Sequence, residues 1–262
     1  MYYRDRSGRI FAMPSDVMAR CRLDPGLVQR RRPEELRHLT GARALTDGQS
    51  YYAVSPELLE PPAAPETMPE HVRRIEAYYA ESDTFGEARR AQEVLAGELD
   101  RMSLIYGDVS ARAVFGALQR IQACRSDRFL DLGCGCGLPV LVASRVVGTA
   151  SGVDLLPGVI DFCRRASSEL GVSNASFEVR DLLSADLSGA DILFVAGTAF
   201  SNALRTALRA KLLEARPGCV IVSVTHNLES WDFLLADTMR CEFPWLRGSR
   251  VRTHVFYFHL RR

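Results

Sequence analysis

A glycine-rich loop directly after an apolar strand constrains this chain more than any other feature. Residues 129–138 read Phe-Leu-Asp-Leu-Gly-Cys-Gly-Cys-Gly-Leu, which places glycine at every second position of the loop, as Gly133, Gly135 and Gly137. Glycine allows a tight turn and lets a ligand approach the backbone without intervening side chains. The pattern therefore predicts a strand-to-helix turn at which a ligand lies close to bare backbone.

The spacing of these glycines and the acid before them favour one kind of ligand over another. Dinucleotide-binding enzymes use the spacing G-x-G-x-x-G at this place to hold a pyrophosphate on a helix N-terminus. Here the spacing is G-x-G-x-G, and Asp131 stands where a carboxylate would repel a pyrophosphate but attract an ammonium group. The loop thus favours an amino-acid-bearing nucleoside over NAD, and a nicotinamide-dependent enzyme is the third-ranked hypothesis.

The loop resembles motif I of the class I S-adenosylmethionine-dependent methyltransferases, which implies that Asp131 meets the amino-acid end of the methyl donor. Asp154 ends the next predicted strand 21 positions after Gly133, near the offset of about 20 residues at which an acid reaches a ribose hydroxyl. By the same resemblance, Asp181 after a third strand would bind the adenine amino group. Each later acid alone could equally cap a helix or end a strand, and their order behind Asp131 favours a donor site. The predicted donor residues are Asp131, Gly133, Cys134, Gly135, Gly137, Asp154, Leu155, Asp181, Leu182 and Ala196.

Apolar strands alternate with helical patterns after the loop, which predicts a mainly parallel sheet with helices on both faces. The segments 240–245 and 250–260 flank Arg247-Gly248-Ser249 and predict an antiparallel hairpin, which is how class I methyltransferases close their sheet. The predicted fold class is α/β: a Rossmann-like, mainly parallel seven-stranded sheet with a C-terminal antiparallel hairpin, plus an N-terminal accessory segment. Further strands are expected at 150–154, 175–180, 191–200 and 219–225, with helices at 111–123 and 203–215.

A proline-rich stretch at 60–65 predicts a domain boundary, because such a segment is extended and free of helix. We expect a small accessory module over 1–65 and an S-adenosylmethionine-binding domain over 66–262. Within the module, 8–18 and 48–58 share an order of glycine, aromatic, alanine and aliphatic residues, which indicates two weak repeats of a short strand and a helix start. Apolar residues at three- and four-residue spacings predict helices over 69–104 that form a lid on the donor pocket.

A narrower resemblance covers roughly residues 100–260. The chain is similar there to the disruptor-of-telomeric-silencing type, the non-SET histone-lysine methyltransferases, which implies a protein acceptor. That family carries paired asparagines after the fourth strand, where this chain has Ala196 and Gly197, so the side chains that would orient a lysine amine are replaced. The resemblance is carried by Tyr106-Gly107-Asp108, the segment 190–195, Ala199-Phe200, the strand 220–223 and the hairpin around Trp245.

Acceptor chemistry is expected just after the fourth and fifth strands, because ligands of parallel α/β sheets lie beyond the carboxyl ends of the strands. His226 follows the fifth strand, and an unperturbed pKa of about 6.5 suits a general base for methyl transfer to a hydroxyl. Tyr106, reaching in from the lid, is the second catalytic candidate. In the alternative, His226 is a hydrogen-bonded structural group, and transfer to a neutral amine or a thiolate needs positioning without a base.

Composition narrows the partners and the compartment. Lys and Arg number 33 against 32 Asp and Glu in 262 residues, so nothing in the charge favours a nucleic acid. No apolar run approaches the ~20 residues of a membrane span, and the N-terminus lacks the apolar stretch of a signal peptide, which predicts a cytoplasmic protein. The seven cysteines are scattered and odd in number, as expected of reduced thiols, and no zinc-finger spacing predicts a metal site.

The sequence therefore predicts an S-adenosylmethionine-dependent methyltransferase that moves a methyl group directly to a small metabolite or natural-product intermediate. A protein side chain, methylated as by the lysine methyltransferases, is the alternative acceptor. A further alternative is a non-catalytic S-adenosylmethionine-binding subunit of a heteromeric enzyme, which the replacement by Ala196 and Gly197 leaves open.

Overall fold

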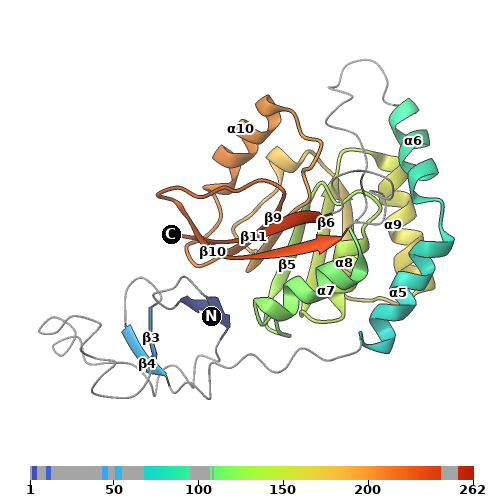
Figure 1. Ribbon diagram of the computed structural model, residues 1–262. Helices are drawn as coiled ribbons and strands as arrows, with labels where there is room; N and C mark the ends of the chain where they lie inside the picture. Colours follow the sequence, from blue (N-terminus) through green and yellow to red (C-terminus); the bar gives the residue numbers. More distant parts are fainter. Residues whose placement is uncertain are drawn as a thin grey trace, which may run out of the picture.

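The computed structural model describes residues 2–4, 10–12, 43–46, 51–54, 68–94, 107, 109–242 and 253–262. These residues form a four-stranded sheet near the N-terminus and a seven-stranded sheet in the order β10-β11-β9-β8-β5-β6-β7 (Figure 1). The larger sheet has a parallel core with antiparallel strands at its C-terminal edge. It confirms the predicted fold class.

The smaller sheet consists of two antiparallel hairpins joined through their first strands. The order is β2-β1-β3-β4, with β1 pairing both β2 and β3. Strands β2 and β4 carry the glycine-flanked aromatic and alanine residues of the two proposed repeats. The helix starts expected after them and the proline-rich boundary at 60–65 lie outside the described residues. The strands are β1 (Tyr2–Arg4), β2 (Ile10–Ala12), β3 (Arg43–Thr46) and β4 (Tyr51–Val54).

The order of the parallel strands creates a switch point in the larger sheet. The chain runs outward from β5 through β6 to β7, then returns to place β8 on the other side of β5. Ligands of open α/β sheets bind where the strand order reverses in this way, beyond the carboxyl ends of the strands. The parallel strands are β5 (Arg128–Leu132), β6 (Thr149–Asp154), β7 (Ala175–Val179), β8 (Ile192–Val195) and β9 (Val220–Val224).

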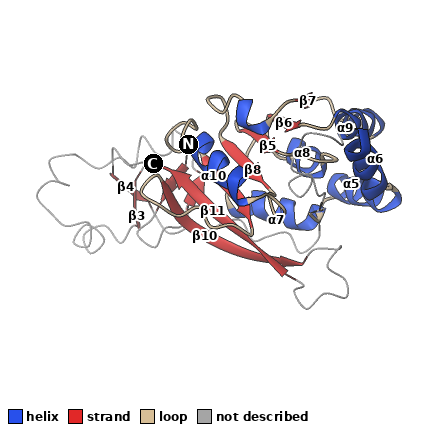
Figure 2. Cartoon of the chain, turned by 90° about the horizontal axis from the view of Figure 1, so that it is seen from above, coloured by secondary structure: helices blue, strands red, loops and turns tan. Residues whose placement is uncertain are grey.

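Five helices of the described residues pack on one face of this sheet and share a single apolar core with it. Figures 1 and 2 show α5, α6 and α9 gathered together at one side of the molecule. The first two helices come from the predicted lid and pack against α7, α8 and α9, while residues 95–106 of that lid lie outside the described residues. The helices are α5 (Glu70–Glu81), α6 (Thr84–Val94), α7 (Ala111–Arg120), α8 (Leu138–Ser144) and α9 (Pro157–Glu169).

The described residues cover only part of the opposite face of the sheet. Helix α10 (Asn202–Leu212) and a single 3-10 turn, Leu182–Ser184, pack there on a second apolar core that includes Phe233. Over β6 and β7 this face carries polar side chains such as Ser151 and Ser176, whose hydroxyl oxygens lie 2.9 Å apart. The predicted helices on both faces are present at β8 and β9. At the outer strands the described residues place no helix on this face, because the β7 to β8 connection contains only the short turn.

The C-terminal hairpin consists of β10 (Phe233–Glu242) and β11 (Thr253–Arg261). Strand β11 inserts between β10 and β9 and is antiparallel to both. The first strand begins at Phe233 rather than at the predicted residue 240. Alternation of apolar and polar residues is the sequence signal that marks where a strand begins. In β10 an irregularity in the register between Leu235 and Asp237 interrupts this alternation, so the sequence did not show the first part of the strand.

Candidate functional site

A buried carboxylate stands at the carboxyl end of β5. Asp131 is 1% exposed, and its backbone pairs with Gly152 of β6 and Phe194 of β8. Neither carboxylate oxygen has a hydrogen-bond partner among the described residues. Burial, and then the charge of Asp154, raise the pKa of Asp131 well above its ordinary value. An unpartnered buried acid is costly to stability, and acids perturbed in this way gather at functional sites.

The loop after β5 takes left-handed backbone conformations at its three glycines. Their φ angles are +81° at Gly133, +51° at Gly135 and +82° at Gly137, in the region that favours glycine. A Cβ atom on Gly133 would lie 3.2 Å from Cζ of Phe200. One on Gly137 would lie 2.7 Å from Sγ of Cys163, so this glycine allows the loop to pack closely against α9.

Asp154, at the end of β6, shapes the same loop. Its Oδ2 accepts a hydrogen bond from the Gly135 N–H at 2.9 Å, and its Oδ1 accepts one from the Leu156 N–H at 3.0 Å. Burial raises the pKa of Asp154, and these backbone hydrogen bonds oppose that shift. Each carboxylate oxygen can accept a second hydrogen bond, so the acid can brace the loop and still receive a hydroxyl.

The end of β7 approaches the glycine loop through Leu182. This side chain is buried, and its Cδ2 lies 3.7 Å from the position of a Cβ on Gly133. Asp181 is exposed, and its Oδ1 accepts a hydrogen bond from the Leu183 N–H at 2.9 Å, which caps the 3-10 turn. The structure therefore brings Leu182 to the donor loop and gives Asp181 a capping role beside it.

Three other predicted donor residues lie around this edge of the sheet. Cys134 is buried, and its side chain packs toward Gly152 in the core, so only its backbone faces the loop. Leu155 and Ala196 are half-buried directly after β6 and β8. With Asp131, Asp154 and the glycines, they place the predicted donor set along the carboxyl ends of neighbouring strands.

Tyr79 of α5 makes a contact with the glycine loop that the sequence did not predict. Its hydroxyl donates a hydrogen bond to the Cys136 carbonyl at 2.5 Å in a buried environment. The ring also meets that of Phe162 edge to face, with centroids 5.9 Å apart. A tyrosine on the apolar side of a helix is normally a core residue, and its partner here lies 57 positions away. The contact ties the first described helix of the lid to the glycine loop.

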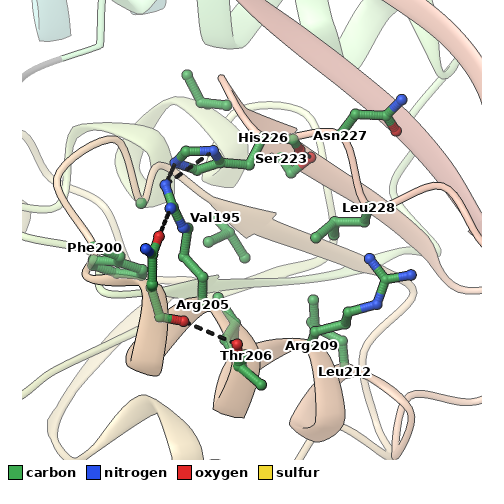
Figure 3. A pocket seen from close by; sticks show the side chains of 14 residues that line it. Val195, Phe200, Arg205, Thr206, Arg209, Leu212, Ser223, His226, Asn227 and Leu228 are labelled. Carbon is green, nitrogen blue, oxygen red and sulfur yellow. Dashed lines mark hydrogen bonds between the residues drawn. The ribbon is translucent and has the colours of Figure 1, made fainter.

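A pocket of about 360 Å³ opens between α10 and the segment after β9 (Figure 3). Phe200 forms part of its wall and also lies against Gly133, so the pocket adjoins the donor loop through one aromatic ring. The lining residues come from the ends of β8 and β9, from α10 and from the loop that contains His226. A ligand in this pocket would therefore lie next to the glycine loop.

His226 faces Arg205 across this pocket (Figure 3). Nη1 of Arg205 lies 3.2 Å from Nε2 and 3.5 Å from Nδ1 of the imidazole, and the other terminal nitrogen donates to Oδ1 of Asn202. Burial and then the charge of Arg205 lower the pKa of His226, against a hydrogen bond with the backbone of Gly197 that raises it. The imidazole is therefore held neutral beside a cation.

Two cations in this pocket were not predicted. Arg205 and Arg209 stand four positions apart on α10, and both line the pocket. Side chains four positions apart lie on the same face of a helix. This spacing is the sequence signal from which the pair of cations could have been predicted. The second catalytic candidate, Tyr106, lies outside the described residues. Within the described ranges, no group of three or more His, Cys, Asp and Glu side chains is arranged to hold a metal ion.

A Rossmann-like sheet with a G-x-G-x-G loop, the buried Asp131 and the half-buried Asp154 at its switch point is the arrangement of a class I S-adenosylmethionine-dependent methyltransferase domain. Residues 125–243 match the family model described as a methyltransferase domain. The chain therefore carries such a domain, whose cofactor is S-adenosylmethionine. None of the described helices is long and apolar enough to cross a membrane.

The similarities to individual proteins are short in sequence or concern the fold. An aklanonic acid methyltransferase from Streptomyces sp. (strain C5) is 38% identical over 58 residues, or 21% of this chain and 26% of that protein. The match thus spans about a quarter of the length of the curated relative. A structure from Pyrococcus horikoshii, described as a candidate RNA methyltransferase, has a TM-score of 0.53 at 14% identity and covers 73% of this chain and 98% of its own. At that identity the likeness concerns the fold. An RNA methyltransferase from Salinibacter ruber, solved with S-adenosyl-L-homocysteine, has a TM-score of 0.49 at 23% identity and covers 59% of this chain and 94% of its own.

Proposed function

We propose that this protein transfers a methyl group from S-adenosylmethionine directly to a small metabolite or natural-product intermediate bound beside Phe200. The observation that carries the proposal is the Asp131 carboxylate, which is buried behind a loop of three left-handed glycines and has no hydrogen-bond partner among the described residues. An ammonium group such as that of the donor's amino-acid end would supply both a countercharge and hydrogen bonds. These residues therefore fit the donor.

The donor residues act by positioning in this proposal. Asp131 would hold the ammonium group, Asp154 the ribose hydroxyls, and Asp181 with Leu182 the adenine, while the loop backbone lines the path between them. When bound, the donor supplies an activated methyl group on a sulfonium. Holding that group in line with an acceptor converts a bimolecular reaction into an effectively unimolecular one, and this alone can supply much of the rate.

A general-base role for His226 stays a prediction. The role requires a ring nitrogen with an available lone pair near the acceptor, whereas Arg205 lies within 3.2 Å of Nε2. A base would have to be released from that contact before each transfer. An acceptor that needs no deprotonation at neutral pH removes this requirement, and the pH profile of turnover distinguishes the two cases.

Two alternative functions are methylation of a lysine side chain and donor binding without catalysis. The first fits the pocket less well, and the second needs a separate measurement. A lysine side chain as acceptor would bring an ammonium group toward Arg205 and Arg209, which would repel it. A non-catalytic subunit would bind the donor and release no S-adenosylhomocysteine with any acceptor. Turnover with a panel of small acceptors, with and without cell extract, therefore separates an enzyme from a silent subunit.

The donor site can be tested directly by calorimetry. Purified protein should bind S-adenosylmethionine and S-adenosylhomocysteine with micromolar affinity, about 8 kcal/mol. Asp154→Ala should lose this binding, whereas Asp161→Asn, an exposed acid on α9, should retain it. Because Asp154 also braces the loop, thermal unfolding of each variant is measured in parallel. Absence of binding to the unmodified protein would overturn the proposal.

A further inference from the structure

We infer that the methyl acceptor is an apolar carboxylic acid whose carboxylate is bound by Arg205. This inference rests on the proposed function, because it names the substrate class of the same site. The first observation is the charge of the pocket. Among the described residues, its titratable lining residues are Arg205, Arg209 and His226, and none of the lining residues is Asp or Glu. Since the whole chain is nearly neutral, with a net charge of +1, this excess of cations is local.

The second observation is that neutral groups hold Arg205 in place. Its guanidinium contacts the imidazole of His226 and donates to the amide oxygen of Asn202. Among the described residues, no carboxylate forms an ion pair with it. A guanidinium carries five N–H donors in a fixed fork, so two such contacts orient the group and leave donors for a bidentate carboxylate. The charge is thus positioned without being neutralised.

Arg209 is more exposed and less firmly held than Arg205, so we expect it to contribute less to binding of a carboxylate. It is exposed, and its closest hydrogen-bond partner is the backbone carbonyl of Glu229 at 3.5 Å. Figure 3 shows it next to Leu228, on the other side of the pocket from His226. An exposed, loosely held cation contributes little to a specific contact. Arg205 is therefore the anchor, and Arg209 adds to the field at the rim.

The third observation is the apolar part of the pocket. Val195, Phe200, Leu208 and Leu228 line it, and the volume of about 360 Å³ suits a small molecule. A polyanion such as RNA would place many negative charges against this apolar wall, and Arg205 is the one positioned cation that could bind them. An apolar body with a single acidic head uses both parts of the pocket, which favours an organic acid.

His226 has a defined part in this arrangement. Its backbone carbonyl accepts a hydrogen bond from the Ser223 hydroxyl at 2.6 Å, and its ring contacts Arg205. It therefore acts as a positioning residue for the anchor. The groups that face the imidazole are Arg205 and, on β11, His254. Because its pKa is lowered, the ring stays neutral at neutral pH and does not compete with Arg205 for the carboxylate.

The test uses matched acid and amide probes with the full chain saturated with S-adenosylhomocysteine. Binding of 2-naphthoate, 2-naphthamide and 2-naphthyl phosphate is followed by their fluorescence. The acid should bind about ten- to a hundredfold more tightly than the amide, as expected for a charge-assisted bidentate contact. Arg205→Gln should abolish this preference, Arg205→Lys should keep part of it, and Arg209→Gln should reduce it less. Arg89→Gln, an exposed residue of α6, should leave it unchanged.

A variant of His226 separates positioning from a general structural role. His226→Gln should weaken binding of 2-naphthoate severalfold and leave binding of 2-naphthamide unchanged, whereas a structural defect would weaken both. Equal affinity for acid and amide, no binding of either, tighter binding of the phosphate, or an unchanged preference in Arg205→Gln would each overturn the inference. Calorimetry with S-adenosylhomocysteine on the same proteins shows separately whether the donor site is intact, so failure of the proposed function is distinguishable.

Discussion

The two sides of the switch point are built in opposite ways. At the ends of β5 and β6, the buried Asp131, the half-buried Asp154 and a backbone loop form the donor side, and Asp154 is hydrogen-bonded to the loop that it supports. At the ends of β8 and β9, two arginines of α10 and the neutral imidazole of His226 line a pocket. The cofactor always has the same chemical structure, so one rigid motif can bind it. An acceptor would be bound by side chains that project from a helix. We therefore expect the donor side to be rigid and to tolerate few substitutions. The acceptor side should accommodate substitutions more readily.

The largest effect is expected from Asp131→Asn on the donor side. The change preserves shape but removes the charge that would meet the donor ammonium group, and loss of one partner of a buried ion pair costs about 3–5 kcal/mol. Calorimetry should show at least about a hundredfold loss of affinity for S-adenosylhomocysteine. Without donor, the variant should unfold at a higher temperature at neutral pH, because a neutral amide is less costly to bury than an unpartnered charge.

These opposite signs distinguish a functional acid from a structural one. A structural acid would lower both stability and affinity when neutralised. Asp127→Asn is the comparison, because Asp127 is also buried in this sheet region but accepts a hydrogen bond from the Cys124 N–H at 2.8 Å. Its neutralisation should lower the melting temperature and leave donor affinity intact. An Asp131→Asn protein that binds the donor normally would contradict the assignment.

A pair of glycine substitutions tests the contrast in rigidity. In Gly137→Ala, the new Cβ would lie 2.7 Å from Cys163 and 2.8 Å from Phe177, at a φ of +82°. Backbone strain and overpacking together should destabilise the fold by about 2–4 kcal/mol. In Gly197→Ala, the Cβ would lie 2.4 Å from the ring of Phe200, a side chain on the pocket wall that can turn away.

We expect Gly197→Ala to cost less stability than Gly137→Ala, on the order of 1 kcal/mol, and to alter acceptor binding more than donor binding. Urea unfolding of both variants gives the free energies, and calorimetry gives the donor affinities. Equal losses of stability would show that the acceptor side is as rigid as the donor side, against the comparison drawn above.

The pH dependence of donor binding follows from the raised pKa of Asp131. Because the folded value lies above the unfolded one, the native state binds more protons in the window between them, and this contribution to stability falls as pH rises through that window. Donor binding requires the carboxylate, so affinity should increase with pH in the same window, by up to about tenfold per pH unit. The window lies above the ordinary range of a carboxyl group. Calorimetry across this range on Asp131→Asn, which should show no such slope, isolates the contribution of Asp131.

The same contrast explains what the sequence could reveal. The strand, the glycine loop and Asp131 are contiguous, so their spacing predicted the local backbone and the parallel core around it. The contacts that complete the site join distant residues: Arg205 meets His226 across 21 positions and Tyr79 meets Cys136 across 57. An arginine or a tyrosine on a helix is normally a solvated or a core residue, and only the packing of α10 and α5 gives these two a partner. The missing α-helix in the described connection between β7 and β8 was not predicted, because a helix was assumed in each crossover.

The smallest expected effect concerns the link between the lid and the donor loop. Tyr79→Phe removes the hydroxyl that donates to the Cys136 carbonyl, which should lower the free energy of unfolding by about 1 kcal/mol. Donor affinity should fall less than tenfold, because the loop remains braced by Asp154. Tyr78→Phe is the matched control, since Tyr78 is half-buried and its hydroxyl meets Glu169 at the surface. If the two variants lose equal stability, α5 rests on the loop by packing alone, and the donor side owes its rigidity to the sheet rather than to the lid.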